Sequence, residues 1–274
     1  FNGSAAQTIP IGVSSVTYNN LTANNTSSAG ATLSAAVTSS RVTGNMSVAA
    51  GTLDNGGFAV AGASGKSLSV ASGAKLRLGG TSAFPTGFTT TLDAASTVEY
   101  YGSTQNVAAL TYGNLTISTT GTATAISGTT TIRGTFWDRT TYNASNRAHV
   151  FNGDFTNDGT FTAGTSTATF SGTGTQTISG ATTFYNLVVD KASGGLTTAA
   201  NATVGATLTL TSGIVTTGVN TLIVTATSAA SVSGGSAASF VDGKMRRGLG
   251  TSSNAQTFAL PVGSGTTYAP ISVG

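Results

Sequence analysis

Few residues in this chain could carry out acid–base or nucleophilic chemistry. The chain has one histidine, His149, no cysteine and eight Asp and Glu residues. A Ser-His-Asp triad would need His149 beside a serine and one of the nearest carboxylates, Asp138, Asp154 or Asp158. Serine is so abundant that its proximity in sequence means little. We therefore predict no catalytic residue and no enzyme activity.

The acidic residues are scattered along the chain, and only Asp154 and Asp158 lie close together. Glycoside hydrolysis needs at least one pair of carboxylates, so an enzyme acting on polysaccharides is a weak alternative. The segment Asp154–Gly159 resembles the first half of a calcium loop. However, Thr165 stands where an EF-hand places its bidentate Glu. We predict a turn there, with no metal and no cofactor.

The segment 136–149 has an unusual composition, because it holds the only Trp, the only His and two arginines. One interpretation is a glycan-binding module, in which Trp137 and Tyr142 stack on a sugar while Arg139 and Arg147 donate hydrogen bonds. The favoured interpretation is a longer loop whose aromatic rings cover an end or a flank of the fold.

A motif of seven to nine residues recurs along the chain and indicates a repeat architecture. Its copies are FNGSAAQTI at 1–9, YGSTQNV at 101–107 and FSGTGTQTI at 170–178, each followed by Tyr, Asn and Leu. The motif glutamines are 98 residues (105 − 7 = 98) and 71 residues (176 − 105 = 71) apart. The repeat is therefore elastic, as when whole turns of a coil are gained or lost. Such irregularity weighs against an ice-binding solenoid, which the Thr-rich stretch 207–211 otherwise resembles.

Short strands separated by turns fill the rest of the chain, and no amphipathic helix is apparent. Runs of three to five residues such as Leu76–Leu78, Leu115–Ile117 and Leu208–Leu210 alternate with turns rich in Gly, Asn and Ser. These runs are shorter than most sandwich strands. We predict an all-β fold, a parallel β-helix (β-solenoid) rod of about 12 turns, with small aliphatic residues inside and hydroxyls outside. The Asn of the Tyr-Asn-Leu motifs is either a corner residue or part of an internal amide ladder.

The composition changes near residue 238. Three of the chain's cations fall in the segment 244–247, and two of its four prolines follow at 261 and 270. Proline is excluded from central strands. We therefore predict repeats over 1–238 and a C-terminal β segment over 239–274 made of edge strands, which caps the helix or contacts another subunit. The candidate assembly contacts are Phe1, Lys244, Arg246, Arg247, Tyr268, Ile271 and Val273.

Charge and hydropathy exclude several partners. Charged residues are only 7% of the chain and the net charge is +3, with no basic stripe that could follow a phosphate backbone. We find neither a long apolar run for a membrane span nor a signal peptide. The chain starts inside a motif and stops in a strand pattern, so we expect a processed protein or a piece of a longer one.

Two regions resemble large cell-surface proteins of Bacteroidetes. These are the stretch TVEYYGSTQNV at 97–107 with the following YGNL, and the order GKMRR at 243–247 with FALPVGSGTTYAPI at 258–271. The resemblance implies export, usually by the type IX route, and a role in adhesins or surface fibres with β-helical stalks. The further β-sandwich and the sorting domain usual in those families are not in this sequence.

The predicted function is therefore structural and adhesive, outside the bacterial cell or on its surface. Two versions stay open: the stalk of an adhesin that contacts glycans or surfaces, or the subunit of an extracellular fibre. In the second version the partner is another copy of the chain, because uncapped β-helix ends expose strand edges.

Overall fold

The computed structural model describes residues 1–13, 16–250 and 256–274, and these are almost entirely strands and turns. The helical element among them is one short 3₁₀ turn, η1 (Ala229–Ser231). None of the described helical structure has the length or hydrophobicity needed to cross a membrane. Strands pair in parallel with strands one turn before and one turn after, so the predicted β-solenoid is confirmed, with about 12 turns in all.

The chain divides into two compact units. Unit 1 comprises Phe1–Ser127 and Asp138–Tyr142, and unit 2 comprises Gly128–Trp137 and Asn143–Gly274. The strands of unit 1 are β1 (Asn2–Gly3), β2 (Gln7–Ile9), β3 (Leu21–Asn25), β4 (Ala31–Leu33), β5 (Met46–Asp54), β6 (Ala61–Val70), β7 (Lys75–Leu78), β8 (Thr86–Leu92), β9 (Thr97–Tyr100), β10 (Gln105–Val107), β11 (Thr111–Tyr112), β12 (Asn114–Ile117) and β13 (Ala123–Ala125). Two strands have residues in both units, β15 (Phe136–Asp138) and β16 (Thr141–Asn143). The strands of unit 2 are β14 (Thr129–Ile132), β17 (Ala148–Phe151), β18 (Phe155–Asn157), β19 (Thr160–Thr162), β20 (Thr167–Phe170), β21 (Gln176–Ser179), β22 (Thr182–Asp190), β23 (Leu196–Thr198), β24 (Ala202–Ser212), β25 (Val215–Val224), β26 (Val232–Gly234), β27 (Val241–Arg247), β28 (Phe258–Leu260), β29 (Val262–Ser264), β30 (Thr267–Tyr268) and β31 (Ile271–Val273).

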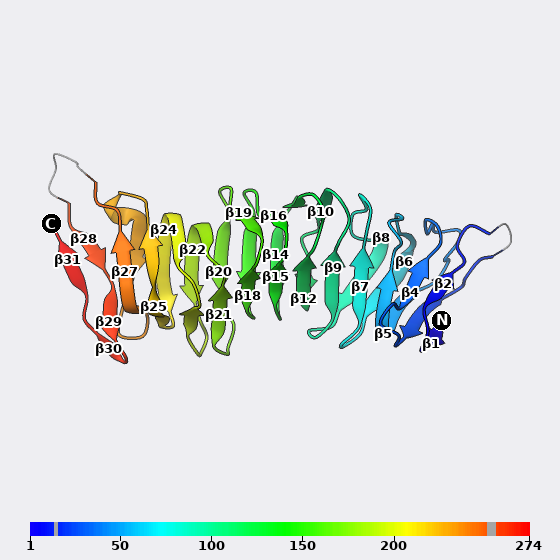
Figure 1. The fold of residues 1–274 in the computed structure, drawn as a ribbon, viewed down its shortest axis with the longest axis horizontal. Coiled ribbons are helices and arrows are strands. Elements are labelled where there is room, and N and C mark those ends of the chain that lie inside the picture. The colour runs from blue at the N-terminus through cyan, green and yellow to red at the C-terminus, as the bar shows by residue number, and fades with distance from the viewer. Residues whose placement is uncertain (14–15, 251–255) are drawn as a thin grey trace. The chain divides into compact units, whose positions relative to one another are not determined.

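Parallel ladders hold each unit together (Figure 1). In unit 1 one ladder runs β2–β4–β5–β7–β9–β12 and a second runs β1–β3–β5–β6–β8. In unit 2 the ladders are β14–β17–β20–β22–β24–β26, β18–β21–β23–β25–β27–β29 and β22–β24–β25–β27. A long strand such as β24 serves two ladders because it turns a corner within its length.

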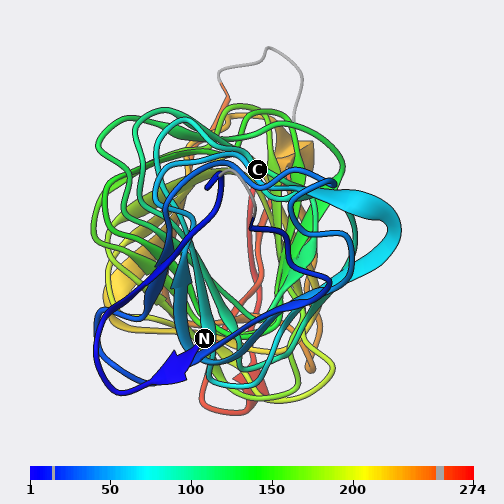
Figure 2. The ribbon, with the colours of Figure 1, turned by 90° about the vertical axis from the view of Figure 1, so that its right-hand side faces the viewer.

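The length of a turn varies, which explains the elastic repeat. Val98 pairs with Leu115, 17 residues later (115 − 98 = 17), whereas Val215 pairs with Val241, 26 residues later (241 − 215 = 26). The ladders stay in register because loops absorb the difference, and Figure 2 shows loops of unequal size outside the turns of unit 1. Extra residues at a corner cost little when the strand pairing is kept.

Side chains that point inward make a narrow apolar core in each unit. In unit 2 this core is largely phenylalanine: the ring centroids of Phe136 and Phe155 are 5.1 Å apart and those of Phe151 and Phe170 are 5.2 Å apart. In unit 1 the hydroxyls of Tyr100 and Tyr112 lie 3.2 Å apart. Aromatic rings on neighbouring turns therefore fill the interior beside the predicted aliphatic residues.

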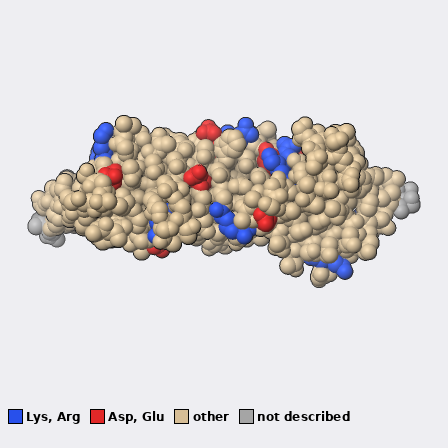
Figure 3. All heavy atoms as spheres, turned by 90° about the horizontal axis from the view of Figure 1, so that it is seen from below, with Lys and Arg blue, Asp and Glu red and all other residues tan. Residues whose placement is uncertain are grey.

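The outer faces carry hydroxyls and amides, as predicted, and Figure 3 shows charged side chains only as small separate groups on one face. The Ser47 hydroxyl donates to Thr22 Oγ1 at 3.0 Å, and the Thr207 hydroxyl donates to Asn186 Oδ1 at 2.7 Å.

The asparagines of the Tyr-Asn-Leu motifs take part in such hydrogen bonds between turns. Among described residues the only non-glycine with positive φ is Ser145, so the corner role proposed for these asparagines is wrong. Glycine fills such corners instead: at Gly51 (φ 66°) a Cβ would lie 1.6 Å from the Asn25 carbonyl oxygen.

The motif glutamine joins two successive turns at a corner. The Gly102 N–H donates to Gln105 Oε1 at 2.7 Å, and Gln105 Nε2 donates to the carbonyls of Leu78 and Ser82, both at 3.0 Å. Gln176 is bonded in the same way: its Oε1 accepts from the Gly172 N–H and its Nε2 donates to the carbonyls of Phe151 and Gly153. Each glutamine is 1% exposed. The recurring Gln is therefore a link to the turn before it.

Gln7 occupies the same place in the first copy of the motif but is only half-buried. Its Oε1 accepts from Asn25 Nδ2 at 2.9 Å.

We expect Gln105→Leu to lower the free energy of unfolding by about 2–4 kcal/mol, because it leaves buried carbonyls and an N–H without partners. Gln7→Leu should cost less than about 1 kcal/mol. Urea unfolding followed by circular dichroism measures both, and equal losses would contradict the role given to Gln105.

The pairing changes direction inside the predicted C-terminal segment 239–274. β27 continues the parallel ladders onto β29, but β29 pairs with β30 and β28 pairs with β31 in antiparallel fashion. Edge strands were predicted here, and β31 is exposed at every residue. Whether the segment is a separate domain stays a prediction.

Candidate functional site

The segment 136–149 is not the long loop that the sequence indicated. It consists of β15, β16 and the start of β17, with short turns between them. Tyr142 is completely buried, so its ring cannot stack on a sugar, and that part of the glycan-binding prediction is wrong. Trp137 is 39% exposed, and its indole Nε1 donates to Asp158 Oδ2 at 2.7 Å.

The two arginines of this segment differ in exposure. Arg139 is exposed and belongs to unit 1, whereas Arg147 is half-buried and belongs to unit 2 together with Trp137. Arg147 also supplies its backbone carbonyl to His149, 3.2 Å from Nδ1. The residues predicted to bind a glycan thus come from both units, and glycan binding by Trp137, Arg139 and Arg147 stays a prediction.

His149 is a core residue of unit 2. It is 1% exposed, and its ring stacks on Phe151 with centroids 6.1 Å apart. Burial lowers the pKa of His149 to about 4, with the Arg147 carbonyl opposing the shift. A neutral, enclosed imidazole of this kind stabilises the core and is poorly placed to exchange protons with a substrate.

This burial predicts a pH dependence. The unfolded chain binds a proton at His149 below its ordinary pKa of about 6.5, while the folded chain does not until about pH 4. Stability is therefore complete above pH 6.5 and is lost as the pH falls from 6.5 to 4, by on the order of 3 kcal/mol.

Urea unfolding followed by the fluorescence of Trp137, which lies in the same unit, measures this loss. The variant His149→Gln should lose less stability over that pH interval. An equal loss in the variant and the parent would contradict the assignment to His149.

The Asp154–Asp158 segment contains strand β18 (Phe155–Asn157), so the turn predicted there is wrong, and both of its carboxylates accept hydrogen bonds. Asp154 Oδ1 accepts from the Thr177 N–H at 2.8 Å, and Asp158 accepts from Trp137. Within the described ranges, no group of three or more His, Cys, Asp or Glu side chains could hold a metal ion.

Unit 1 also contains a charged cluster that was not predicted from the sequence. Arg77 lies between two carboxylates, 2.9 Å from Asp54 Oδ2 and 3.1 Å from Glu99 Oε2, and Lys75 Nζ is 3.4 Å from Glu99. The Tyr101 hydroxyl donates to Asp54 at 2.5 Å, while its ring lies 4.0 Å from the Arg77 guanidinium carbon. Asp54, Arg77 and Glu99 are successive partners in the β5–β7–β9 ladder.

The surroundings of Glu99 and Tyr101 show that the charged groups of this cluster interact with one another. Burial raises the pKa of Glu99, but the Ser118 hydroxyl, Lys75 and Arg77 together outweigh it and lower the pKa overall. Burial and the Asp54 carboxylate raise the pKa of Tyr101. Glu99 therefore stays charged, and both carboxylates are paired with Arg77, which suits a link between turns better than the free acid and base of a hydrolase. Because Asp54, Arg77 and Glu99 are about one turn apart in sequence, the turn length was the signal that could have found them.

The predicted assembly contacts have different environments. Phe1 is half-buried, its ring is 5.9 Å from that of Tyr18, and its amino group donates to the Thr22 carbonyl at 2.8 Å. Arg247 is only 8% exposed, and its guanidinium donates to the carbonyls of Ser228, Ala229 and Ala259. Arg247 thus holds unit 2 together internally, so its prediction as an assembly contact is wrong.

The other C-terminal candidates lie at the surface of unit 2. Lys244 and Arg246 are exposed, Ile271 is 53% exposed and Val273 is 39% exposed. Tyr268 is half-buried, with its ring 5.8 Å from that of Phe240. Whether any of them contacts another chain stays a prediction.

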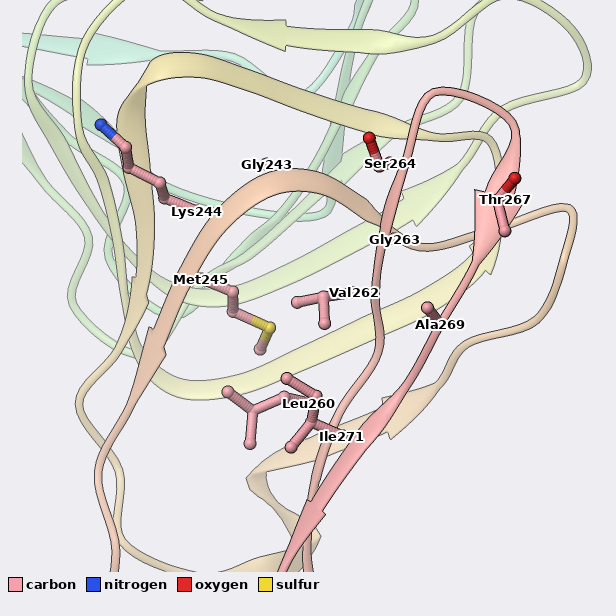
Figure 4. A pocket seen from close by; sticks show the side chains of 10 residues that line it. All are labelled: Gly243, Lys244, Met245, Leu260, Val262, Gly263, Ser264, Thr267, Ala269 and Ile271. Carbon is pink, nitrogen blue, oxygen red and sulfur yellow. The ribbon is translucent and has the colours of Figure 1, made fainter.

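A hollow of about 510 Å³ lies beside these residues at the C-terminal end of unit 2. Its walls come from β27, β28, β29, β30 and β31, and it is lined by Gly243, Lys244, Met245, Leu260, Val262, Gly263, Ser264, Thr267, Ala269 and Ile271. Figure 4 shows the side chains of Met245, Leu260, Val262 and Ile271 grouped together, while the Lys244 amine points away from them. This apolar hollow was not predicted, and it is the candidate binding site of the described chain.

Comparison of the chain with protein-family models, with curated proteins and with solved structures gives no match. The site must therefore be interpreted from its own chemistry.

Proposed function

We propose that this chain is a non-enzymatic structural protein of the bacterial surface, a β-solenoid that serves as the stalk of an adhesin or as the subunit of an extracellular fibre. The observation that carries the proposal is the parallel pairing of successive turns in both units. A solenoid of this kind distributes its stability over many similar contacts between neighbouring turns, which suits a spacer.

The polar groups support a structural role. The charged cluster of unit 1 is paired internally, His149 is buried, and the carboxylates of Asp154 and Asp158 accept hydrogen bonds from their own unit. The resemblance of 97–107 and 243–271 to Bacteroidetes surface proteins supports export, with the type IX route as part of the proposal. Partners in this proposal are other copies of the chain or surface glycans, rather than nucleic acid or a membrane interior.

The location can be tested on intact cells that produce the protein. An antibody against the purified chain, with gold-labelled secondary antibody, should decorate the cell surface in electron micrographs. Labelling confined to permeabilised cells would contradict a surface protein.

The fibre and the stalk can be distinguished with the purified chain. In the fibre version, negative-stain electron micrographs show filaments whose length grows with protein concentration. In the stalk version they show single particles at every concentration, and binding to a glycan array or a surface then depends on Trp137 and the arginines near it. Globular aggregates without order would contradict both versions.

A further inference from the structure

The second half of β27 pairs with a strand on one side only. In the β22–β24–β25–β27 ladder, Leu222 of β25 has Ala202 on one side and Met245 on the other. Met245 and its neighbours pair with β25, while β29 reaches β27 only at Val241 and Asp242. Among the described residues, the stretch Lys244–Arg247 therefore has a free outer edge, with backbone donors and acceptors that a further strand could use.

The hollow lies beside this free edge and continues the core. Leu222 is completely buried, whereas Met245, the next residue of the same column, is half-buried and lines the hollow. Val241 is likewise buried, while its ladder partner Val262 is half-buried and lines the hollow. Two columns of core residues thus end at apolar side chains that line the hollow. At every earlier turn of these ladders the next strand covers the corresponding side chains, so a further β-strand fits here.

The charges at the edge indicate which strand fits. Lys244 and Arg246 alternate with Met245 and are exposed. Their ladder partners on β25 are Thr221 and Ile223, which carry no charge. Lys244 Nζ donates to the Val219 backbone carbonyl at 3.0 Å, and neither Lys244 nor Arg246 is ion-paired with an Asp or Glu among the described residues. Opposite charges directly across strands stabilise pairing by about 0.2–1 kcal/mol each.

We propose that the outer edge of Lys244–Arg247 is an acceptor site for an extended polypeptide strand with apolar residues at alternate positions and Asp or Glu between them. The strand would add to β27 through backbone hydrogen bonds, place its apolar residues in the hollow, and bring its carboxylates to Lys244 and Arg246. A small apolar molecule would leave the backbone edge unpaired. This inference names a partner for the proposed structural protein and rests on that proposal only for its biological setting.

Two synthetic heptapeptides test the proposal, one alternating Glu and Val and the other alternating Lys and Val. By isothermal titration calorimetry, the wild-type chain should bind the Glu peptide at least about tenfold more tightly, because two charge pairs together are worth roughly 1.4 kcal/mol. In the double variant Lys244→Glu/Arg246→Glu the preference should reverse. Because both residues are exposed, the variant should keep the circular dichroism spectrum of the parent.

A second pair of variants tests the hollow. Ile271→Asp places a carboxylate in the apolar wall and should weaken binding of the Glu peptide at least about tenfold. Ile126→Asp is the matched control, because Ile126 is 43% exposed, belongs to unit 1 and does not line the hollow. This variant should bind like the wild type.

Several outcomes overturn the inference. These are no binding of the Glu peptide, equal binding of both peptides, an unchanged preference in the charge-reversed variant, or full binding by Ile271→Asp. Self-association of the wild type that Ile271→Asp abolishes, without peptide binding, would assign the edge to a second copy instead. None of these results bears on surface labelling of cells, so the structural proposal and this inference can fail separately.

Discussion

Backbone hydrogen bonding between successive turns is the constraint on which the rest of this structure depends. A short strand has too little side-chain area to be stable alone, and here each one gains stability from the turn before and the turn after it. The pairing fixes which residues share a column, as with Leu53, Leu76 and Val98. Every other feature of the two units, from the phenylalanine core to the hydroxyl-covered surface, follows from those columns.

The same constraint explains where polar side chains go. A corner leaves backbone groups that no ladder can pair, and burying them without partners is costly. Gln105 and Gln176 supply the missing donors and acceptors, which is why the Gln recurs in the sequence motif. The cluster of Asp54, Arg77 and Glu99 links three turns on the outer face. The chain thus uses its few strong polar groups to join turns to one another.

Much of the fold could be predicted from sequence, and much of the candidate site could not. Alternating short runs and spaced glycines identified the solenoid, because inward and outward positions differ in every strand. Tyr142 and Arg247 were misjudged because a polar, aromatic or charged residue can face inward when its neighbours receive it. The hollow was missed because it depends on β29 turning back into β30, a change from parallel to antiparallel pairing that strand propensity does not encode.

Disulfide trapping tests the register between turns most directly, since the chain has no cysteine of its own. The pair Thr22→Cys/Ser47→Cys joins residues that are opposite one another in the β3–β5 ladder, and their hydroxyl oxygens lie 3.0 Å apart. The account predicts rapid, near-complete disulfide formation for this pair under mild oxidation. The pair Thr22→Cys/Ala49→Cys is displaced by two residues along β5 and should form little disulfide. Equal trapping of both pairs, or none of either, would contradict a parallel β-solenoid with this register.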